Sequence, residues 1–302
     1  MILAAVNFQT LSDAVGLGAI YALMAVGIGL VFGVLRLVNF AYGQLVMAGA
    51  YTLAFTSSWS VPLSIGACFA VVVALSLAME TVVFRPLRGQ SPAVMLVTTF
   101  AISFLLQAVA LIVDLRDNTL GEVAASISSL NEPITVAGVD IRKITLVSVA
   151  VAAFALLVLA LLLTRTTIGL HTRAAAADFR TARLLGVRAN RVIAFAVVLS
   201  GLLAAAVAVM MTVQFPLVSP DFALRDTIVV LVGVVVGGID RLWTATLGGF
   251  TIGFVSGVLN GALPTDKTVY LPSAVFALVI LVLLVRPAGL FAWGRRAAVE
   301  RV

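Results

Sequence analysis

The stretch LSDAVGLGAIYALMAVGIGLVFGVL, residues 11–35, decides the fold class, because a single charged residue, Asp13, interrupts a long apolar run. A hydrocarbon core about 30 Å thick is spanned by roughly 20 apolar residues in a helix. The rest of the chain is similar: 62% of its 302 residues are hydrophobic, 11% are charged, and the mean hydropathy is +1.20. Soluble domains carry about 25% charged residues. The composition excludes a soluble enzyme and a disordered chain, and predicts an integral membrane protein.

Apolar runs of this kind recur along the chain. The expected spans are Leu11–Leu35, Val38–Thr56, Val61–Phe84, Ala93–Val113, Ile144–Leu163, Val192–Val213, Ile228–Ile239, Trp243–Ala262 and Leu271–Val285. The seventh run reaches only about 18 Å at the rise of an α-helix, so it either begins earlier or forms a short re-entrant segment buried against protein. We therefore predict a polytopic all-α protein with eight or nine transmembrane helices in one domain, residues 1–302.

Charged residues are unequally divided between alternate loops. One side holds 14 of the 19 Lys and Arg residues and the other holds 9 of the 13 Asp and Glu residues. Because Lys and Arg are retained on the cytoplasmic side, we expect the loop Thr164–Arg191 and the C-terminus to be cytoplasmic and the segment Asp114–Lys143 to be external. The positive-inside rule accounts for the net charge of +6 without a nucleic-acid partner.

The two hydrophilic segments carry local patterns. In the cytoplasmic loop, the alanine-rich stretch Arg173–Leu185 predicts a short surface helix with Gly186 as its C-cap. Its apolar face is formed by Ala175, Phe179 and Ala182. The loop is either a solvated basic segment that orients the protein, which the pattern alone favours, or a helix that docks into a groove on a soluble partner. In the external segment, alternation around Ala137-Gly138 predicts a small hairpin, which serves either as a spacer or as a docking surface.

The sequence lacks the residues that several classes of function require. The lone Cys68 and the lone His171 leave no thiolate or histidine metal site, so no metal ligands are expected. No ionisable residue lies near the middle of the longer spans, which disfavours a proton pump. The chain contains no GxxxxGK[ST] phosphate loop and no catalytic constellation. We expect a transport subunit that is not an enzyme and binds no cofactor of its own.

Small or neutral polar residues lie on one face at the start of the second span and along one stripe of the fourth. They are Asn39, Gly43, Gln44, Thr99, Ser103 and Gln107. Buried groups of this kind most often join helices by hydrogen bonds, and the alternative is a path for a small uncharged or zwitterionic solute. Four glycines in the eighth span recur at every fourth residue: Gly249, Gly253, Gly257 and Gly261. This spacing predicts a ridge for close helix packing.

These features together resemble the permease subunits of branched-chain amino-acid ABC importers and their urea and amide relatives. The resemblance rests on Gly16–Tyr51 with Asn39, Phe40, Ala41 and Gly43 at its centre, on ETVVFRPLRG (residues 80–89), on TIGLHTRAAAADFRTARLLGV (residues 167–187) and on LLVRPAGLF (residues 283–291). The chain departs from the family pattern in GGIDRLWTATLGG (residues 237–249), where Asp240, Arg241 and Trp243 replace a tight glycine turn.

The resemblance implies a permease subunit of an ATP-driven importer of small polar solutes, above all branched-chain amino acids, working by alternating access. It implies a coupling helix that docks on a cytoplasmic ATPase, with Arg173, Asp178, Phe179, Ala182, Leu185 and Gly186 at the contact. The implied partners are a second permease, two ATPase subunits that bind ATP and Mg, and a periplasmic or extracellular solute-binding protein. The implied location is the bacterial inner membrane. The alternative is a self-sufficient channel or secondary carrier for urea or short amides.

Overall fold

The computed structural model describes residues 8–35, 38–87, 89–117, 133–136, 139–238, 241–264 and 269–286. The helices are α1 (Phe8–Leu35), α2 (Tyr42–Phe55), α3 (Val61–Met79) with the π-helical turn Glu80–Phe84, α4 (Pro92–Asp117), α5 (Lys143–Arg165), α6 (Thr167–Ala177), α7 (Phe179–Leu184), α8 (Ala189–Gln214), α9 (Leu224–Gly237), α10 (Leu242–Ala262) and α11 (Leu271–Val285). Strands β1 (Pro133–Val136) and β2 (Val139–Arg142) pair antiparallel, with Ile134 opposite Ile141, so the predicted hairpin is present.

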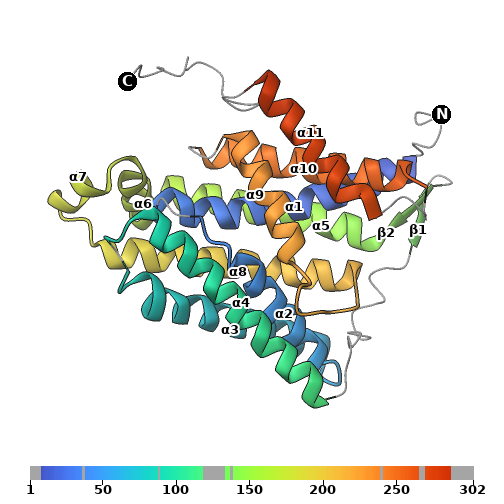
Figure 1. Ribbon diagram of the computed structural model, residues 1–302, viewed down its shortest axis with the longest axis horizontal. Coiled ribbons are helices and arrows are strands. Elements are labelled where there is room, and N and C mark those ends of the chain that lie inside the picture. The colour runs from blue at the N-terminus through green and yellow to red at the C-terminus, as the bar shows by residue number, and fades with distance from the viewer. Residues whose placement is uncertain are drawn as a thin grey trace.

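Helix α1 is the centre of the bundle. Every residue from Gly18 to Val31 is buried, and the helix packs against α5, α8, α9 and α10. In Figure 1, α1 runs through the middle of the molecule, with α2, α3 and α4 on one side and α10 and α11 on the other. The α6–α7 loop lies at one end of this bundle and the β1–β2 hairpin at the opposite end.

The outer helices turn large apolar side chains outward. On α4, Phe104 and Leu105 are about 60% exposed, and on α5 Phe154 is 67% exposed. A soluble protein rarely presents such surfaces, whereas lipid tails solvate them without cost. Within the described residues, six helices are long and apolar enough to cross a bilayer, and α11 is a shorter apolar helix. The predicted polytopic all-α membrane fold is confirmed.

Besides α11, two predicted spans are shorter than a bilayer. Helix α9 has 14 residues and begins at Leu224, four residues before the predicted start. Helix α2 also has 14 residues and begins at Tyr42, so the predicted start at Val38 is wrong. The reason is local, because Oδ1 of Asn39 accepts a hydrogen bond from the backbone N–H of Ala41 at 3.1 Å. Asparagine side chains that bind nearby backbone groups compete with helix formation.

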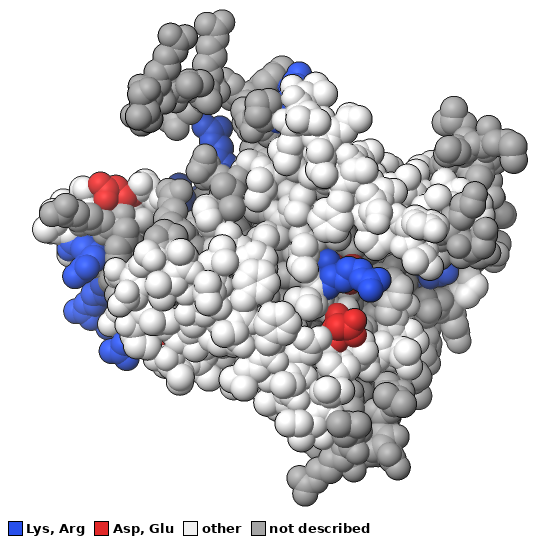
Figure 2. All heavy atoms as spheres, viewed as in Figure 1, with Lys and Arg blue, Asp and Glu red and all other residues white. Residues whose placement is uncertain are grey.

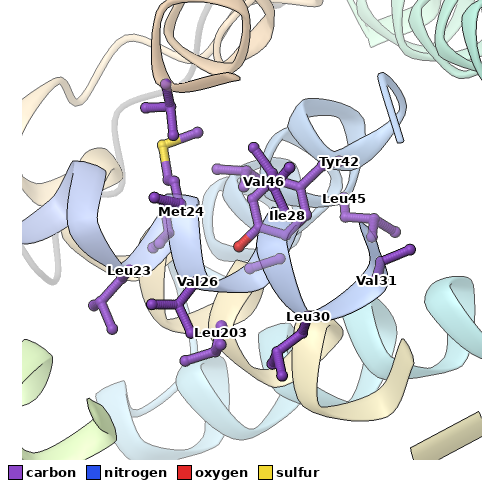
Figure 3. Packing of buried hydrophobic residues seen from close by; sticks show 14 of the residues in the cluster. Leu23, Met24, Val26, Ile28, Leu30, Val31, Tyr42, Leu45, Val46 and Leu203 are labelled. Atoms are coloured by element: carbon purple, nitrogen blue, oxygen red, sulfur yellow. The ribbon is translucent and has the colours of Figure 1, made fainter. Parts of the chain in front are cut away.

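Close packing against α1 depends on small residues. Figure 3 shows the Tyr42 ring of α2 among buried aliphatic side chains of α1, including Ile28 and Val31. A Cβ added at Gly27 would collide with the Tyr42 hydroxyl. The Ser200 hydroxyl of α8 also donates a hydrogen bond to the Gly27 carbonyl at 2.8 Å. The lack of a side chain at Gly27 therefore allows α2 to approach the central helix, and its carbonyl joins α8 to the same point.

The glycine ridge of α10 lies along α1. The four contacts run in antiparallel order, from Gly249 on Tyr21 and Ala25, through Gly253 on Gly18 and Gly257 on Ala14, to Gly261 on Thr10. A Cβ at Gly253 would stand 2.8 Å from the Gly18 Cα, and one at Gly257 would stand 2.5 Å from the Ala14 Cα. Backbone atoms cannot rotate away from such contacts, so these positions require glycine for the observed helix separation.

Helix α10 also packs closely against α9. An added Cβ at Gly237 would collide with the Thr244 carbonyl, and one at Gly248 would collide with the Gly233 carbonyl. Between these helices, Gly238 adopts φ +105°, and the Thr244 hydroxyl donates to the Gly238 carbonyl at 2.7 Å. The turn therefore keeps one left-handed glycine. Asp240, part of the unusual sequence at this turn, lies outside the described residues.

Candidate functional site

The cytoplasmic loop predicted from the sequence forms two helices. The predicted single helix Arg173–Leu185 is wrong, because α6 begins at Thr167 and the chain is extended at Asp178 (φ −149°, ψ 105°) before α7. The Asp178 carboxylate accepts a hydrogen bond from the Thr181 backbone N–H at 3.1 Å, which caps the start of α7. Asp178 therefore ends one helix and begins the next, since an Asp side chain at an N-cap satisfies a free helical N–H.

Gly186 ends α7 as predicted. Its φ is +89°, and its N–H bonds to the Arg183 carbonyl at 3.1 Å. The Val187 N–H bonds to the Ala182 carbonyl at 3.1 Å, which completes a Schellman motif. A left-handed residue at this position favours glycine. The cap turns the chain back toward α8 and leaves the last residues of α7 projecting from the bundle.

The two faces of the loop differ in exposure. Ala175 and Ala182 are 3% and 4% exposed, so the apolar stripe predicted for a partner packs onto this chain instead. Leu184 and Leu185 are 83% and 80% exposed. We call this exposed pair the loop tip. Leu184 was not among the residues predicted for the contact. The side chain of Phe179 lies outside the described residues.

Basic side chains surround the loop tip. Arg173, Arg183 and Arg188 are exposed on α6, on α7 and just before α8. In Figure 2, blue atoms gather at the edge of the molecule over this loop, beside white surface. An apolar pair with a cationic rim is the pattern of a docking surface, because buried apolar anchors supply affinity and a charged rim steers the encounter.

The predicted polar residues of the second and fourth spans come together. Nε2 of Gln44 donates to Oγ of Ser103 at 3.3 Å, and Oγ1 of Thr99 donates to the Val38 carbonyl at 3.3 Å. Asn39, Gln44, Thr99 and Ser103 are each at most 3% exposed. This arrangement joins α4 to α2 and to the segment before it. The geometry fits helix-joining hydrogen bonds better than the wall of an open path.

The remaining two residues of this set lie apart from that network. An added Cβ at Gly43 would stand 2.8 Å from the Ala223 carbonyl, so Gly43 packs α2 against the start of α9. Gln107 is half-buried, one turn beyond Ser103 on α4. Both positions are compatible with packing, and neither lines the larger cavity described next.

Replacing Ser103 with alanine tests the packing interpretation. The change leaves the buried Gln44 amide without its hydroxyl partner, so we expect a loss of about 1 kcal/mol in stability. Transport kinetics of the folded protein are expected to stay unchanged. Thermal unfolding and uptake assays measure the two effects. The matched control is Thr98→Ala, because Thr98 is half-buried on the same helix and its hydroxyl bonds to the Val94 carbonyl one turn back in that helix. A raised KM for solute without a stability loss would contradict the interpretation.

A cavity of about 410 Å³ opens at the hairpin end of the bundle. Its walls come from α1, α8, α9, α10, α11 and the segment between α8 and α9. It is lined by Tyr21, Arg225, Asp226 and Ser256, none of which is among the site residues predicted from the sequence. The Tyr21 hydroxyl donates a hydrogen bond to the Asp226 carboxylate. These residues lie up to 235 positions apart, so no local pattern links them.

Fold and surfaces together define a polytopic membrane protein with an exposed loop at one end of the bundle and a cavity at the other. A family model described as the permease component of the branched-chain amino acid transport system matches residues 10–285, and the chain belongs to this family.

Curated relatives match almost the whole chain. The high-affinity branched-chain amino acid transport system permease protein BraD of Pseudomonas aeruginosa is 32% identical, with 97% of each chain covered. The permease protein LivH of Escherichia coli K12, from a system of the same description, is 28% identical over 97% of each chain. A probable branched-chain amino acid transport permease protein LivH of Methanocaldococcus jannaschii is 27% identical, covering 89% of this chain and 87% of that one.

A solved structure shares the fold. PsaBC from Streptococcus pneumoniae in complex with Fab superposes with a TM-score of 0.52 over 95% of this chain and 97% of that chain, at 13% identity. At this identity the likeness concerns the fold alone.

Proposed function

We propose that this chain is the membrane-spanning subunit of an ATP-driven importer for branched-chain amino acids, working by alternating access. Membership in the permease family supports this proposal, together with relatives of that description that cover nearly the full length. The observation that carries the coupling to ATP is the loop tip, where Leu184 and Leu185 are exposed at the end of a helix capped by Asp178 and Gly186. A groove on a soluble subunit would bury this pair.

The proposed assembly contains a second permease, two cytoplasmic ATPase subunits and a solute-binding protein outside the membrane. ATP and Mg would be bound by the ATPase subunits. Closure of the ATPases would move α6 and α7, and α6 packs against α1, α5 and α8, so the movement would reach the central helix directly. The hairpin end would face the binding protein.

Purification from the native membrane in mild detergent, with mass spectrometry of what accompanies the chain, tests the assembly. We expect an ATPase and a second permease to accompany it. Recovery of this chain alone after crosslinking, with uptake that needs no ATP, would overturn the proposal in favour of a channel or secondary carrier.

The proposed orientation places α6–α7 in the cytoplasm of a bacterial inner membrane, with the C-terminus on the same side. It is supported by the excess of basic residues in the loops at that end.

Cysteine labelling checks this orientation, because Cys68 is fully buried and should not react. We expect Arg173→Cys to react with an impermeant maleimide in inverted vesicles and to be protected in intact cells with a permeabilised outer membrane. Leu217→Cys, exposed between α8 and α9, should show the reverse. The opposite pattern at both sites would contradict the orientation.

A further inference from the structure

The cavity at the hairpin end has an inner wall of buried residues and a more open mouth. Met211, Val229 and Val275, from α8, α9 and α11, are at most 6% exposed and give the inner wall an apolar surface. At the mouth, Asp221 and Arg225 are exposed. Figure 2 shows acidic and basic atoms close together over the segment between α8 and α9. A volume of about 410 Å³ lies within the usual range of small-molecule sites.

Two opposite charges line this cavity from consecutive positions of α9. Asp226 is partly buried and accepts the hydrogen bond from Tyr21, which fixes its carboxylate while leaving further acceptor capacity. Arg225 forms no ion pair with a carboxylate in the part of the chain that the structure describes. Both residues lie in the first turn of the helix, where its dipole favours an anionic group. The site thus offers one acceptor for a cation and one donor set for an anion.

A buried hydroxyl adds a third polar group. Ser256 of α10 lines the cavity at 4% exposure, and its Oγ has no hydrogen-bond partner in the structure. Buried polar atoms are nearly always paired, so the Ser256 hydroxyl is available to a molecule bound in the cavity. Tyr21 and Ser256 come from α1 and α10, whose separation is fixed by the glycine ridge. The polar groups are therefore held on closely packed helices.

We propose that this cavity binds a free aliphatic α-amino acid on its way through the protein. Asp226 receives the ammonium group, Arg225 receives the carboxylate, and the side chain lies against the apolar wall formed by Met211, Val229 and Val275. The inference rests on the proposed import function and deepens it, by giving the permease its own recognition of a zwitterion. Urea and short amides carry no charged groups, so they would make no charge-assisted hydrogen bonds with Asp226 and Arg225.

Direct binding of three isosteric ligands to the purified complex tests the assignment, with no solute-binding protein added. The ligands are leucine, isoamylamine, which lacks the carboxylate, and isocaproate, which lacks the ammonium. We expect the unmodified complex to bind leucine about tenfold or more tighter than either analogue, because each charge-assisted hydrogen bond contributes about 1.5–3 kcal/mol.

The variants should change selectivity in opposite directions. Asp226→Asn keeps an acceptor for Tyr21 and should weaken leucine binding about tenfold or more while changing isocaproate binding little. Arg225→Gln should weaken leucine binding to a similar degree while changing isoamylamine binding little. A misfolded protein would lose all three ligands, so this pattern separates recognition from structure. The matched controls are Asp13→Asn and Arg142→Gln, a half-buried pair 4.0 Å apart at the same end and outside the cavity.

Failure of the two proposals would look different. If the complete transporter imports leucine but both cavity variants bind all three ligands like the controls, the cavity assignment is overturned and the import function stands. If the complete transporter neither imports nor binds leucine and carries an uncharged amide instead, both proposals fall.

Discussion

Replacing Leu184 and Leu185 together with glutamate is expected to abolish ATP-driven uptake while the chain still folds and inserts. Both side chains are at least 80% exposed, so the substitution removes little packing within this chain. In a partner's groove, burial of each leucine would contribute about 1.5–3 kcal/mol, and a carboxylate there would also be desolvated. Together these effects would weaken docking by at least a hundredfold.

The measurement is uptake by the complex in proteoliposomes, together with retention of the ATPase during purification. The matched control is Val269→Glu, because Val269 is 81% exposed at the opposite end of the bundle. This control should retain the ATPase. If the double variant keeps both the ATPase and normal uptake, the loop tip is not the docking surface. Leu184 and Leu185 suit this test because both side chains lie outside the packed face of the loop.

Features that depend on composition or on local backbone chemistry could be predicted from the sequence. The apolar runs predicted the helices, the glycine spacing predicted the ridge on α10, and Gly186 predicted the end of α7. The break at Asp178 also had a local signal, since Asp is one of the residues preferred at a helix N-cap. The alanine-rich composition outweighed that signal in the prediction of one continuous helix.

The candidate site depends on contacts that no local pattern contains. Tyr21 and Asp226 are 205 positions apart, and neither residue is unusual in its own segment. The pattern of the polar stripe on α4 favours helix-joining hydrogen bonds and leaves a solute path as the alternative, and Ser103 and Thr99 do bond to α2 and to the segment before it. Periodicity shows that polar residues share one face of a helix, but it does not show whether that face packs against a neighbouring helix or lines a cavity. The tertiary arrangement therefore favours the cavity beside α1, and not the polar residues of α2 and α4, as the proposed solute site.

Replacing Gly257 with leucine is expected to have the largest effect on stability. A Cβ at this position would stand 2.5 Å from the Cα and 2.8 Å from the Cβ of Ala14, so α1 and α10 must move apart. Overpacking a well-packed core costs about 1–3 kcal/mol, and more where backbone must shift. Apolar side chains gain nothing from leaving lipid, so lost van der Waals contact between membrane helices is not compensated. We expect little folded protein in the membrane.

A graded series at two glycines makes this prediction specific. Alanine, valine and leucine at Gly257 should lower the midpoint of unfolding in detergent progressively, because each adds atoms against α1. The same series at Gly66 of α3 should change the midpoint little, since an added Cβ there meets nothing within 4 Å. Equal losses in the two series would contradict the prediction, because contact with Ala14 would then not explain the requirement for glycine at position 257. A steep series at Gly257 alone would establish that the α1–α10 ridge determines the spacing of the helices that carry Tyr21 and Ser256.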